Sequence, residues 1–159
     1  MNMKEVYVSG IALDREREFP VVLIRSEDGE EVLPIWIGAA EATAIYTVLA
    51  GKSLERPMTH DLLKLVVEEL GGKVREIEIT GIHEDTYFAR IVLGRGDELF
   101  YLDARPSDAI ALALRAGSII KVEEKLFEKY KRNLQIGRVE AGSGEDGLEE
   151  RDPEEFKDI

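Results

Sequence analysis

The chain has no cysteine, and this absence removes two kinds of chemistry. Disulfide bonds and thiolate metal sites both require cysteine, so neither is available here. The sequence also lacks an apolar run long enough to cross a bilayer, and its first residues lack the apolar block of a signal peptide. We therefore expect a cytoplasmic protein with no membrane contact.

An excess of basic residues is missing as well. The chain holds 21 lysines and arginines against 33 acidic residues, for a formal net charge of −12. Residues 141–159 contribute −6 of that charge through eight acids and two bases. A dedicated nucleic-acid binder normally carries a basic footprint. Any contact with nucleic acid must therefore be local, and a metal ion could bridge it.

What the chain does contain is enough apolar sequence for a core. Its 159 residues are 44% hydrophobic, which indicates one folded domain. Short alternating strands joined by turn signals outnumber the helices, which predicts an α+β fold: a largely antiparallel sheet with three to four helices packed on it. We expect this single domain to span residues 1–140 and a disordered acidic tail to follow at 141–159. The expected helices lie at about 38–50, 59–70, 106–117 and 123–133.

Two arginine–proline pairs stand at the start of two of these helices. Proline suits the first helical turn, where its missing N–H costs nothing, and Ser, Thr or Asp there satisfies or complements free N–H groups. An arginine beside the positive helix end favours a phosphate or carboxylate. We therefore interpret four residues as candidate phosphate-binding residues: Arg56 and Thr59 in Arg56-Pro57-Met58-Thr59-His60-Asp61, and Arg105 and Ser107 in Arg105-Pro106-Ser107-Asp108.

Three carboxylates lie close to these pairs in the pattern. Glu41 shares a helical face with apolar residues, where a lone carboxylate is costly unless it is paired or used. Asp103 ends a strand, and Asp108 follows one helical turn after Arg105. Glu41, Asp103 and Asp108 could together hold Mg²⁺ or Mn²⁺ through oxygen ligands. The alternative is that Glu41 and Asp108 only complement helix ends and Asp103 only caps a turn.

His60 is one of two histidines. Its position between Thr59 and Asp61 makes it a candidate general base or metal ligand, whereas the alternative is an ordinary first-turn residue after Thr59 as N-cap. We expect His60, Asp61 and Glu41 to be the catalytic residues, with Asp61 tuning His60. His83 lies in a charged turn and is expected to be solvated.

Several phrases, in this order, resemble the bifunctional nuclease domain family: Leu33-Pro34-Ile35-Trp36-Ile37-Gly38, Glu41-Ala42, Arg56-Pro57-Met58-Thr59-His60-Asp61-Leu62, and Asp103-Ala104-Arg105-Pro106-Ser107-Asp108-Ala109-Ile110-Ala111-Leu112. The resemblance covers about residues 3–130. It implies RNase and DNase activity. Some members carry an extra C-terminal helical module, and this chain has its acidic tail there instead.

Our leading hypothesis is a nuclease that hydrolyses phosphodiester bonds of RNA or DNA with metal assistance. Arg56 and Arg105 would hold the phosphate, and His60 would activate water or protonate the leaving oxygen. One rival is a non-enzymatic anion-binding, regulatory or assembly module. Another is purely structural, with ion pairs of the Glu41–Arg105 and Asp103–Arg56 type knitting helices to the sheet. The nuclease hypothesis predicts that six residues lie around one cleft: Glu41, Arg56, His60, Asp103, Arg105 and Asp108.

Self-association is expected from the strands. Pro34 and Trp36 near a strand end, and the alternating apolar positions of residues 74–82, indicate a sheet edge that must be covered. We expect a homo-oligomer, with a dimer favoured. Trp36, Phe88, Phe100 and Tyr101 are expected in the core or in an interface rather than as base-stacking platforms.

Overall fold

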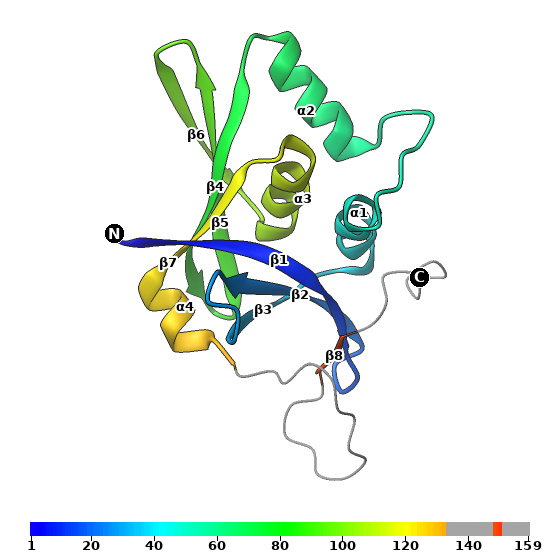
Figure 1. Cartoon of the computed structure of the whole chain (residues 1–159), viewed down its shortest axis with the longest axis vertical. Helices are drawn as coiled ribbons and strands as arrows, with labels where there is room; N and C mark the ends of the chain where they lie inside the picture. The colour runs from blue at the N-terminus through cyan, green and yellow to red at the C-terminus, as the bar shows by residue number, and fades with distance from the viewer. Residues whose placement is uncertain (133–147, 151–159) are drawn as a thin grey trace.

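Residues 1–132 and 148–150 are described in the computed structural model, and hairpins organise most of them (Figure 1). In chain order the elements are β1 (Met3–Asp14), β2 (Phe19–Ser26), β3 (Val32–Trp36), α1 (Ala39–Leu49), α2 (Thr59–Glu69), β4 (Lys73–His83), β5 (Thr86–Arg95), β6 (Glu98–Ala104), α3 (Pro106–Ala116), β7 (Ile119–Glu123), α4 (Glu124–Tyr130) and β8 (Leu148–Glu150).

The strands form one sheet in the order β3-β2-β1-β7-β4-β5-β6, and β8 pairs with β1. Neighbouring strands are antiparallel except β4 and β7, which run parallel. That parallel pair is possible because α3 intervenes between β6 and β7 and carries the chain back across the sheet. The predicted α+β class with a largely antiparallel sheet is confirmed.

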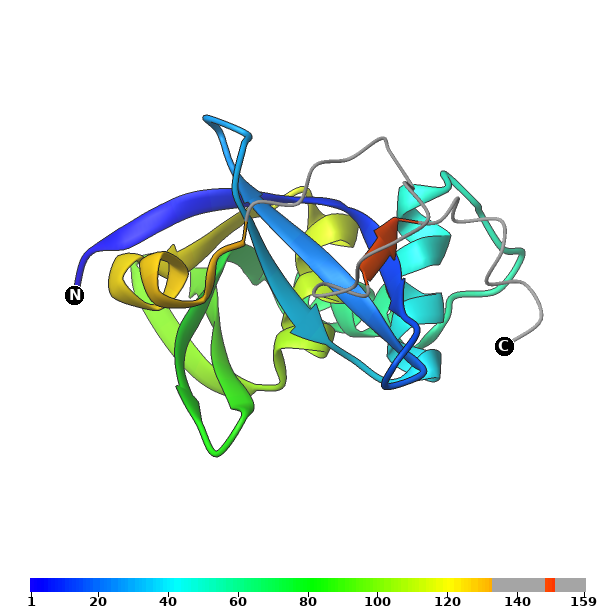
Figure 2. The same ribbon diagram turned by 90° about the horizontal axis from the view of Figure 1, so that it is seen from below.

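Helix α3 is the centre of the helical layer. It packs on β4, β5 and β7, and both α1 and α2 pack on it, so these helices lie together on one side of the sheet (Figure 1). Residues 109–113 of α3 are all at most 1% exposed, as its small side chains predict. Helix α4 lies at the other end of the molecule from α1 (Figure 2). Its Leu126 and Phe127 join the same core.

The two edges of the sheet differ. Strand β3 forms one edge, as Pro34 predicts, and its Val32 exchanges backbone hydrogen bonds with Arg132 beyond α4 (2.9 and 2.7 Å). Strand β6 forms the other edge, and all its residues except Ala104 are exposed. Helix α2, next to α3, contains no buried residue.

Three sequence-based expectations are wrong in detail. Residues 74–82 do not form an edge, because β4 lies inside the sheet between β7 and β5. The last helix ends at Tyr130, earlier than expected, because Arg132 is extended enough to pair with β3. Helix α2 is N-capped by Met58, not Thr59, and Asp61 accepts the Met58 N–H (2.9 Å).

The expected disordered tail, residues 141–159, lies outside the described residues except for β8. Those three residues pair with Ala12–Asp14 of β1. Among the described residues, no helix is long and apolar enough to cross a membrane.

Candidate functional site

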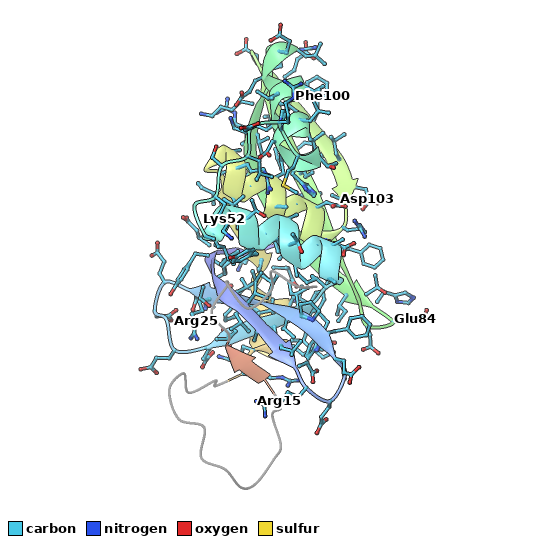
Figure 3. All side chains as sticks on the ribbon, turned by 90° about the vertical axis from the view of Figure 1, so that its right-hand side faces the viewer. Arg15, Arg25, Lys52, Glu84, Phe100 and Asp103 are labelled. Atoms are coloured by element: carbon cyan, nitrogen blue, oxygen red, sulfur yellow. The ribbon has the colours of Figure 1, made fainter. Side chains whose placement is uncertain are left out.

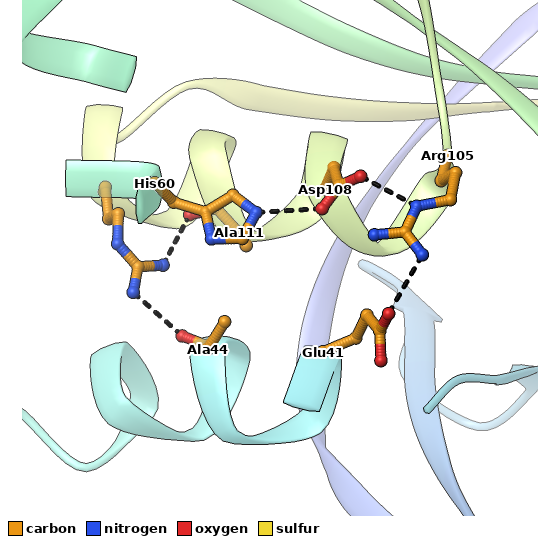
Figure 4. A network of polar contacts seen from close by, with 7 residues as sticks. Glu41, Ala44, His60, Arg105, Asp108 and Ala111 are labelled. Atoms are coloured by element: carbon orange, nitrogen blue, oxygen red, sulfur yellow. Dashed lines mark hydrogen bonds and ion pairs between the residues drawn. The ribbon is translucent and has the colours of Figure 1, made fainter. Parts of the chain in front are cut away.

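Four side chains from α1, α2 and the start of α3 form a continuous polar chain (Figure 4). The Arg105 guanidinium donates from NH1 to Glu41 Oε1 (2.9 Å) and from Nε to Asp108 Oδ2 (2.8 Å). The other Asp108 oxygen, Oδ1, lies 2.9 Å from His60 Nε2. One carboxylate therefore joins the arginine to the histidine.

Local backbone structure explains why these groups meet. Arg105 is the N-cap of α3, Pro106 occupies the first helical turn, and Asp108 follows at the third position, within reach of Arg105. Glu41 occupies the third position of α1 after its N-cap, Gly38. The Glu41 carboxylate lies where a side chain at Gly38 would be, so glycine leaves it the space to reach Arg105.

The charges within this network reinforce one another. Burial alone raises the pKa of Asp108, but hydrogen bonds from Arg105 and His60 outweigh that effect and hold the pKa below its usual value. The pKa of Arg105 is raised, chiefly by its hydrogen bonds to Asp108 and Glu41. Asp108 is therefore an anion at neutral pH, and an ionised carboxylate only accepts hydrogen bonds. Consequently His60 Nε2 carries the hydrogen, and Nδ1 is the atom left to accept a proton.

Asp61 belongs to a separate contact. Its carboxylate accepts from Arg115 Nε (2.7 Å), and the Arg115 side chain is only 4% exposed. The same guanidinium donates to the backbone carbonyls of Ala111 in α3 and Ala44 in α1 (2.9 and 3.0 Å). Asp61 thus fastens α2 to the other two helices rather than hydrogen-bonding to His60. The Met58 N–H is the main cause of its lowered pKa.

The remaining candidates are placed apart from the network. Arg56 is exposed in the loop before α2, and Thr59 is exposed in the first turn of that helix. Asp103 lies near the end of β6 (Figure 3). It pairs with Arg90 in the β5–β6 register, and alternation along the strand places it on the face opposite Leu102. Ser107 is buried at the start of α3. Four of the six residues expected around one cleft therefore converge, and Arg56 and Asp103 do not join them.

The proposed metal ligands are not assembled as one set. Arg105 binds one carboxylate oxygen of Glu41 and one of Asp108, and Asp103 is not part of this network. Within residues 1–132 and 148–150, no three acidic or histidine side chains are grouped to hold a metal ion. This donor arrangement does not fit a preformed Mg²⁺ or Mn²⁺ site.

A cavity of about 450 Å³ opens beside the network. Glu41, Arg105 and Ser107 line it together with the end of β3, the β4–β5 turn and the end of α4. The Arg105 side chain is 64% exposed, so it is accessible although it is paired. Sequence reasoning missed Arg115 and the part of the cavity wall contributed by Arg17, Tyr87 and Tyr130. A signal existed only for Arg115, as a lone arginine ending an otherwise apolar helix.

Comparison with known proteins places this site in a family. The model of the bifunctional nuclease domain matches residues 22–135. The chain belongs to the bifunctional nuclease domain family. The matched range of this domain contains all four residues of the polar network, Arg115 and most of the cavity wall.

Curated relatives of this bifunctional nuclease domain come from bacteria and plants. An uncharacterized protein of Mycobacterium tuberculosis strain H37Rv is 40% identical over 125 residues, covering 79% of this chain and 74% of the relative. Bifunctional nuclease 1 of Arabidopsis thaliana is 28% identical over 135 residues, covering 81% and 42%. Bifunctional nuclease 1 of Oryza sativa subsp. japonica is 29% identical over 119 residues, covering 72% and 35%. The chain therefore spans less than half the length of either plant protein.

Proposed function

We propose that this protein is a nuclease that hydrolyses phosphodiester bonds of RNA, DNA or both. The observation that carries the proposal is the Asp108 carboxylate, whose two oxygens hold Arg105 and His60 beside an open cavity. Family membership and the plant relatives named bifunctional nucleases support the same chemistry.

Each residue has a role in this proposal. The exposed Arg105 fork binds the scissile phosphate, because a guanidinium matches two phosphate oxygens at once. His60, held by Asp108 through Nε2, accepts through Nδ1 the proton of the attacking water. The water oxygen forms a bond to phosphorus and the ester P–O bond breaks. The leaving oxygen takes a proton from solvent and departs as an alcohol, and His60 returns its proton to solvent. Glu41 positions Arg105.

Metal assistance needs a separate test. Arg105 already binds one oxygen of Glu41 and one of Asp108, so Mg²⁺ or Mn²⁺ at these two carboxylates would compete with the guanidinium. Cleavage with added Mg²⁺, with Mn²⁺ and with chelator measures the requirement directly.

The test of the nuclease proposal is cleavage of labelled single-stranded RNA and DNA by the purified full chain. We expect cleavage that His60→Ala abolishes, whereas His83→Ala, at the only other histidine, keeps it. His83 is a suitable control because its side chain is 77% exposed and is not among the residues that line the cavity. Equal cleavage by both variants would overturn the assignment and point to a contaminant.

A second candidate is a non-enzymatic anion-binding or regulatory module. It is favoured by the pairing of Glu41 and Asp108 with Arg105, which is the kind of ion pair that a structural network would contain. The cleavage assay distinguishes the two candidates, because a folded non-enzymatic module would leave labelled RNA and DNA uncut.

We also propose that the protein self-associates as a dimer. Five apolar side chains of α2 are between 41% and 69% exposed: Leu62, Leu63, Leu65, Val66 and Leu70. On the edge strand β6, Phe100 and Leu102 share one side by alternation and are 38% and 46% exposed. We call these seven residues the α2–β6 face. Exposed apolar side chains gathered in this way are typical of an interaction surface.

A second copy of the chain is the occupant that suits this face. The unpaired edge of β6 can pair antiparallel with the same edge of another copy around a two-fold axis. Charges of both signs border the face, with Glu68 and Glu69 on α2 and Arg75 and Arg95 on neighbouring strands, as self-complementary pairing requires.

Light scattering at micromolar concentration tests this. We expect twice the 17.9 kDa chain mass, reduced to one chain mass by Leu102→Lys. Leu54→Lys is the matched control, because Leu54 is 56% exposed but lies in the loop outside the α2–β6 face. A monomeric parent protein would overturn the proposal. The cytoplasmic location expected from the sequence stays a prediction.

A further inference from the structure

The cavity beside Arg105 has a wall that the proposed hydrolysis does not use. Three aromatic side chains, Trp36, Tyr87 and Tyr130, line it, and they come from β3, β5 and α4. Its volume of about 450 Å³ lies within the range of small-molecule sites. Aromatic rings beside Arg105, the proposed phosphate-binding residue, suit a ligand that combines a planar group with a phosphate.

The aromatic rings are held in fixed positions. Trp36 Nε1 donates to Oδ2 of Asp14, the last residue of β1 (2.7 Å), and this hydrogen bond fixes the indole. Tyr87 and Tyr130 pack edge to face with centroids 6.3 Å apart. Burial raises the pKa of Tyr87 to about 12, so its phenol stays neutral and can donate a hydrogen bond. Rigid rings lose little conformational entropy when a ligand stacks on them.

Cations gather at the same wall. The Arg17 guanidinium lies 4.8 Å from the Trp36 ring centroid and that of Arg132 lies 5.5 Å from it, and Arg105 stands at the α3 side. Glu41 and Asp85 are the acids of the lining. Three arginines therefore line the cavity in a chain whose net charge is −12, although Arg17 and Arg105 also pair with acids. Guanidinium planes beside aromatic rings suit a planar group that carries a phosphate.

We infer that the cavity binds one unpaired nucleobase of a single-stranded nucleic acid, with its phosphate at Arg105. This inference rests on the proposed nuclease function and names its substrate class. Stacking on aromatic and guanidinium planes is the usual way in which proteins hold unpaired bases. A base inside a duplex is stacked and paired, so it must leave the helix before it can enter a recess of this size. The indole that the sequence assigned to core or interface thus lines the binding wall.

Trp36 is the only tryptophan of the chain, so its fluorescence reports directly on the cavity. We would titrate the full chain with adenosine 5′-monophosphate, ribose 5-phosphate and inorganic phosphate. We expect the nucleotide to quench the fluorescence and to bind at least about tenfold more tightly than ribose 5-phosphate, because stacking of one base contributes about that factor or more. Equal affinity for all three would overturn the inference and leave a simple anion site.

Two variants locate the base. Tyr130→Leu should lower nucleotide affinity about tenfold and leave phosphate affinity unchanged, since it removes a stacking ring and no charge. Tyr101→Leu is the matched control, because Tyr101 is 57% exposed on β6 and does not line the cavity. An equal effect of both variants would also overturn the inference. Circular dichroism confirms that each variant is folded.

Strand preference completes the test and separates it from hydrolysis. In His60→Ala, which lies outside the cavity wall, a single-stranded oligonucleotide should quench Trp36 and compete with the mononucleotide, whereas a blunt duplex should do so at least about tenfold more weakly. Cleavage by the parent without base-dependent quenching leaves the nuclease proposal standing and sinks this inference. Base-dependent quenching without cleavage does the reverse.

Discussion

The two edge strands of the sheet differ in how far the rest of the chain covers them: β3 is mostly buried and β6 is mostly exposed. At the β3 edge, Val32, Leu33, Pro34 and Ile35 are all buried, and the backbone of Arg132 pairs with the strand. At the β6 edge, every residue except Ala104 is exposed, and helix α2, which packs on α3 and β4, buries none of its residues. Both edge strands are largely apolar in sequence, so the difference lies mainly in what the chain supplies to cover them.

Polar contacts, together with the packing of Val67 on the core, hold α2 in place. Arg115 clamps Asp61 to α1 and α3, and His60 bonds to Asp108 at the start of α3. The leucines of α2 are exposed, whereas His60 and Asp61 contact α3 and Arg115, which reverses the usual arrangement of a surface helix. This reversal is what the proposed dimer explains.

Truncating a leucine should change the free energy of unfolding far more at the β3 edge than at the β6 edge, and this is the largest effect that we expect. Leu33→Ala removes a fully buried side chain and should lower the free energy of unfolding by about 2–5 kcal/mol. Leu102→Ala, at a side chain 46% exposed, should cost less than about 1 kcal/mol in the isolated chain and instead weaken self-association. Urea unfolding over a range of protein concentrations measures both effects. Equal costs at the two positions would contradict the distinction.

The clamp on α2 should be the next largest effect. Arg115→Ala leaves the carbonyls of Ala111 and Ala44 without their donor and Asp61 without its partner, and should destabilise the protein by about 1–3 kcal/mol, the scale for an unpaired buried polar group. Arg75→Ala is the control, because Arg75 is exposed and substitutions there should stay within about 0.5 kcal/mol. Thermal unfolding by circular dichroism measures both. A clamp variant as stable as the control would mean that α2 is held by other contacts.

The two arginine–proline helix starts can be compared in the cleavage assay. Arg105→Ala should lower the rate by roughly 10²-fold, as expected for losing one strong electrostatic contributor to the transition state. Arg105→Lys should also be damaging, because an ammonium lacks the fork that meets Glu41 and Asp108 together. Arg56→Ala should lower the rate much less, since Arg56 lies outside the network. Equal losses at Arg56 and Arg105 would restore the sequence-based view that both hold phosphate.

Acid should loosen α2 by a smaller amount. The pKa values of Asp61 and Asp108 are held below the ordinary 3.8, so their contribution to stability is present above pH 3.8 and lost as the pH falls through the lowered values. We expect the stability difference between the parent and Asp61→Asn to shrink by about 1 kcal/mol from pH 7 to pH 3, because Asp61 is more than a third exposed and solvent screens it. Urea unfolding at the two pH values measures it, and a constant difference would argue against the ion pair.

Local rules in the sequence explain why most of the fold was predictable. Hairpin turns, alternation and the arginine–proline starts act over a few residues, so helices and strands could be placed from them. The parallel pairing of β4 with β7 joins segments about 40 residues apart, and no local pattern encodes it. The position of β4 inside the sheet was missed for this reason.

The candidate site divides in the same way. Glu41, Arg105 and Asp108 were found because helix starts have recognisable chemistry. The face of Asp103 was available from alternation, since Leu102 and Ala104 flank it and must point to the opposite side. The cavity could not be predicted from the sequence, because Arg17, Tyr87 and Tyr130 come together only when the strands have assembled into the sheet.

Gly38 imposes a rule on the sequences that can carry this site. Its φ of −76° and ψ of 166° are open to any residue, so backbone freedom is not what glycine supplies here. It supplies an empty volume that the Glu41 carboxylate fills. Gly38 and Glu41 therefore depend on each other. A side chain at position 38 would displace the Glu41 carboxylate from Arg105 while the helix and the core stay intact. Such a change would pass every assay of folding and be visible only in the chemistry.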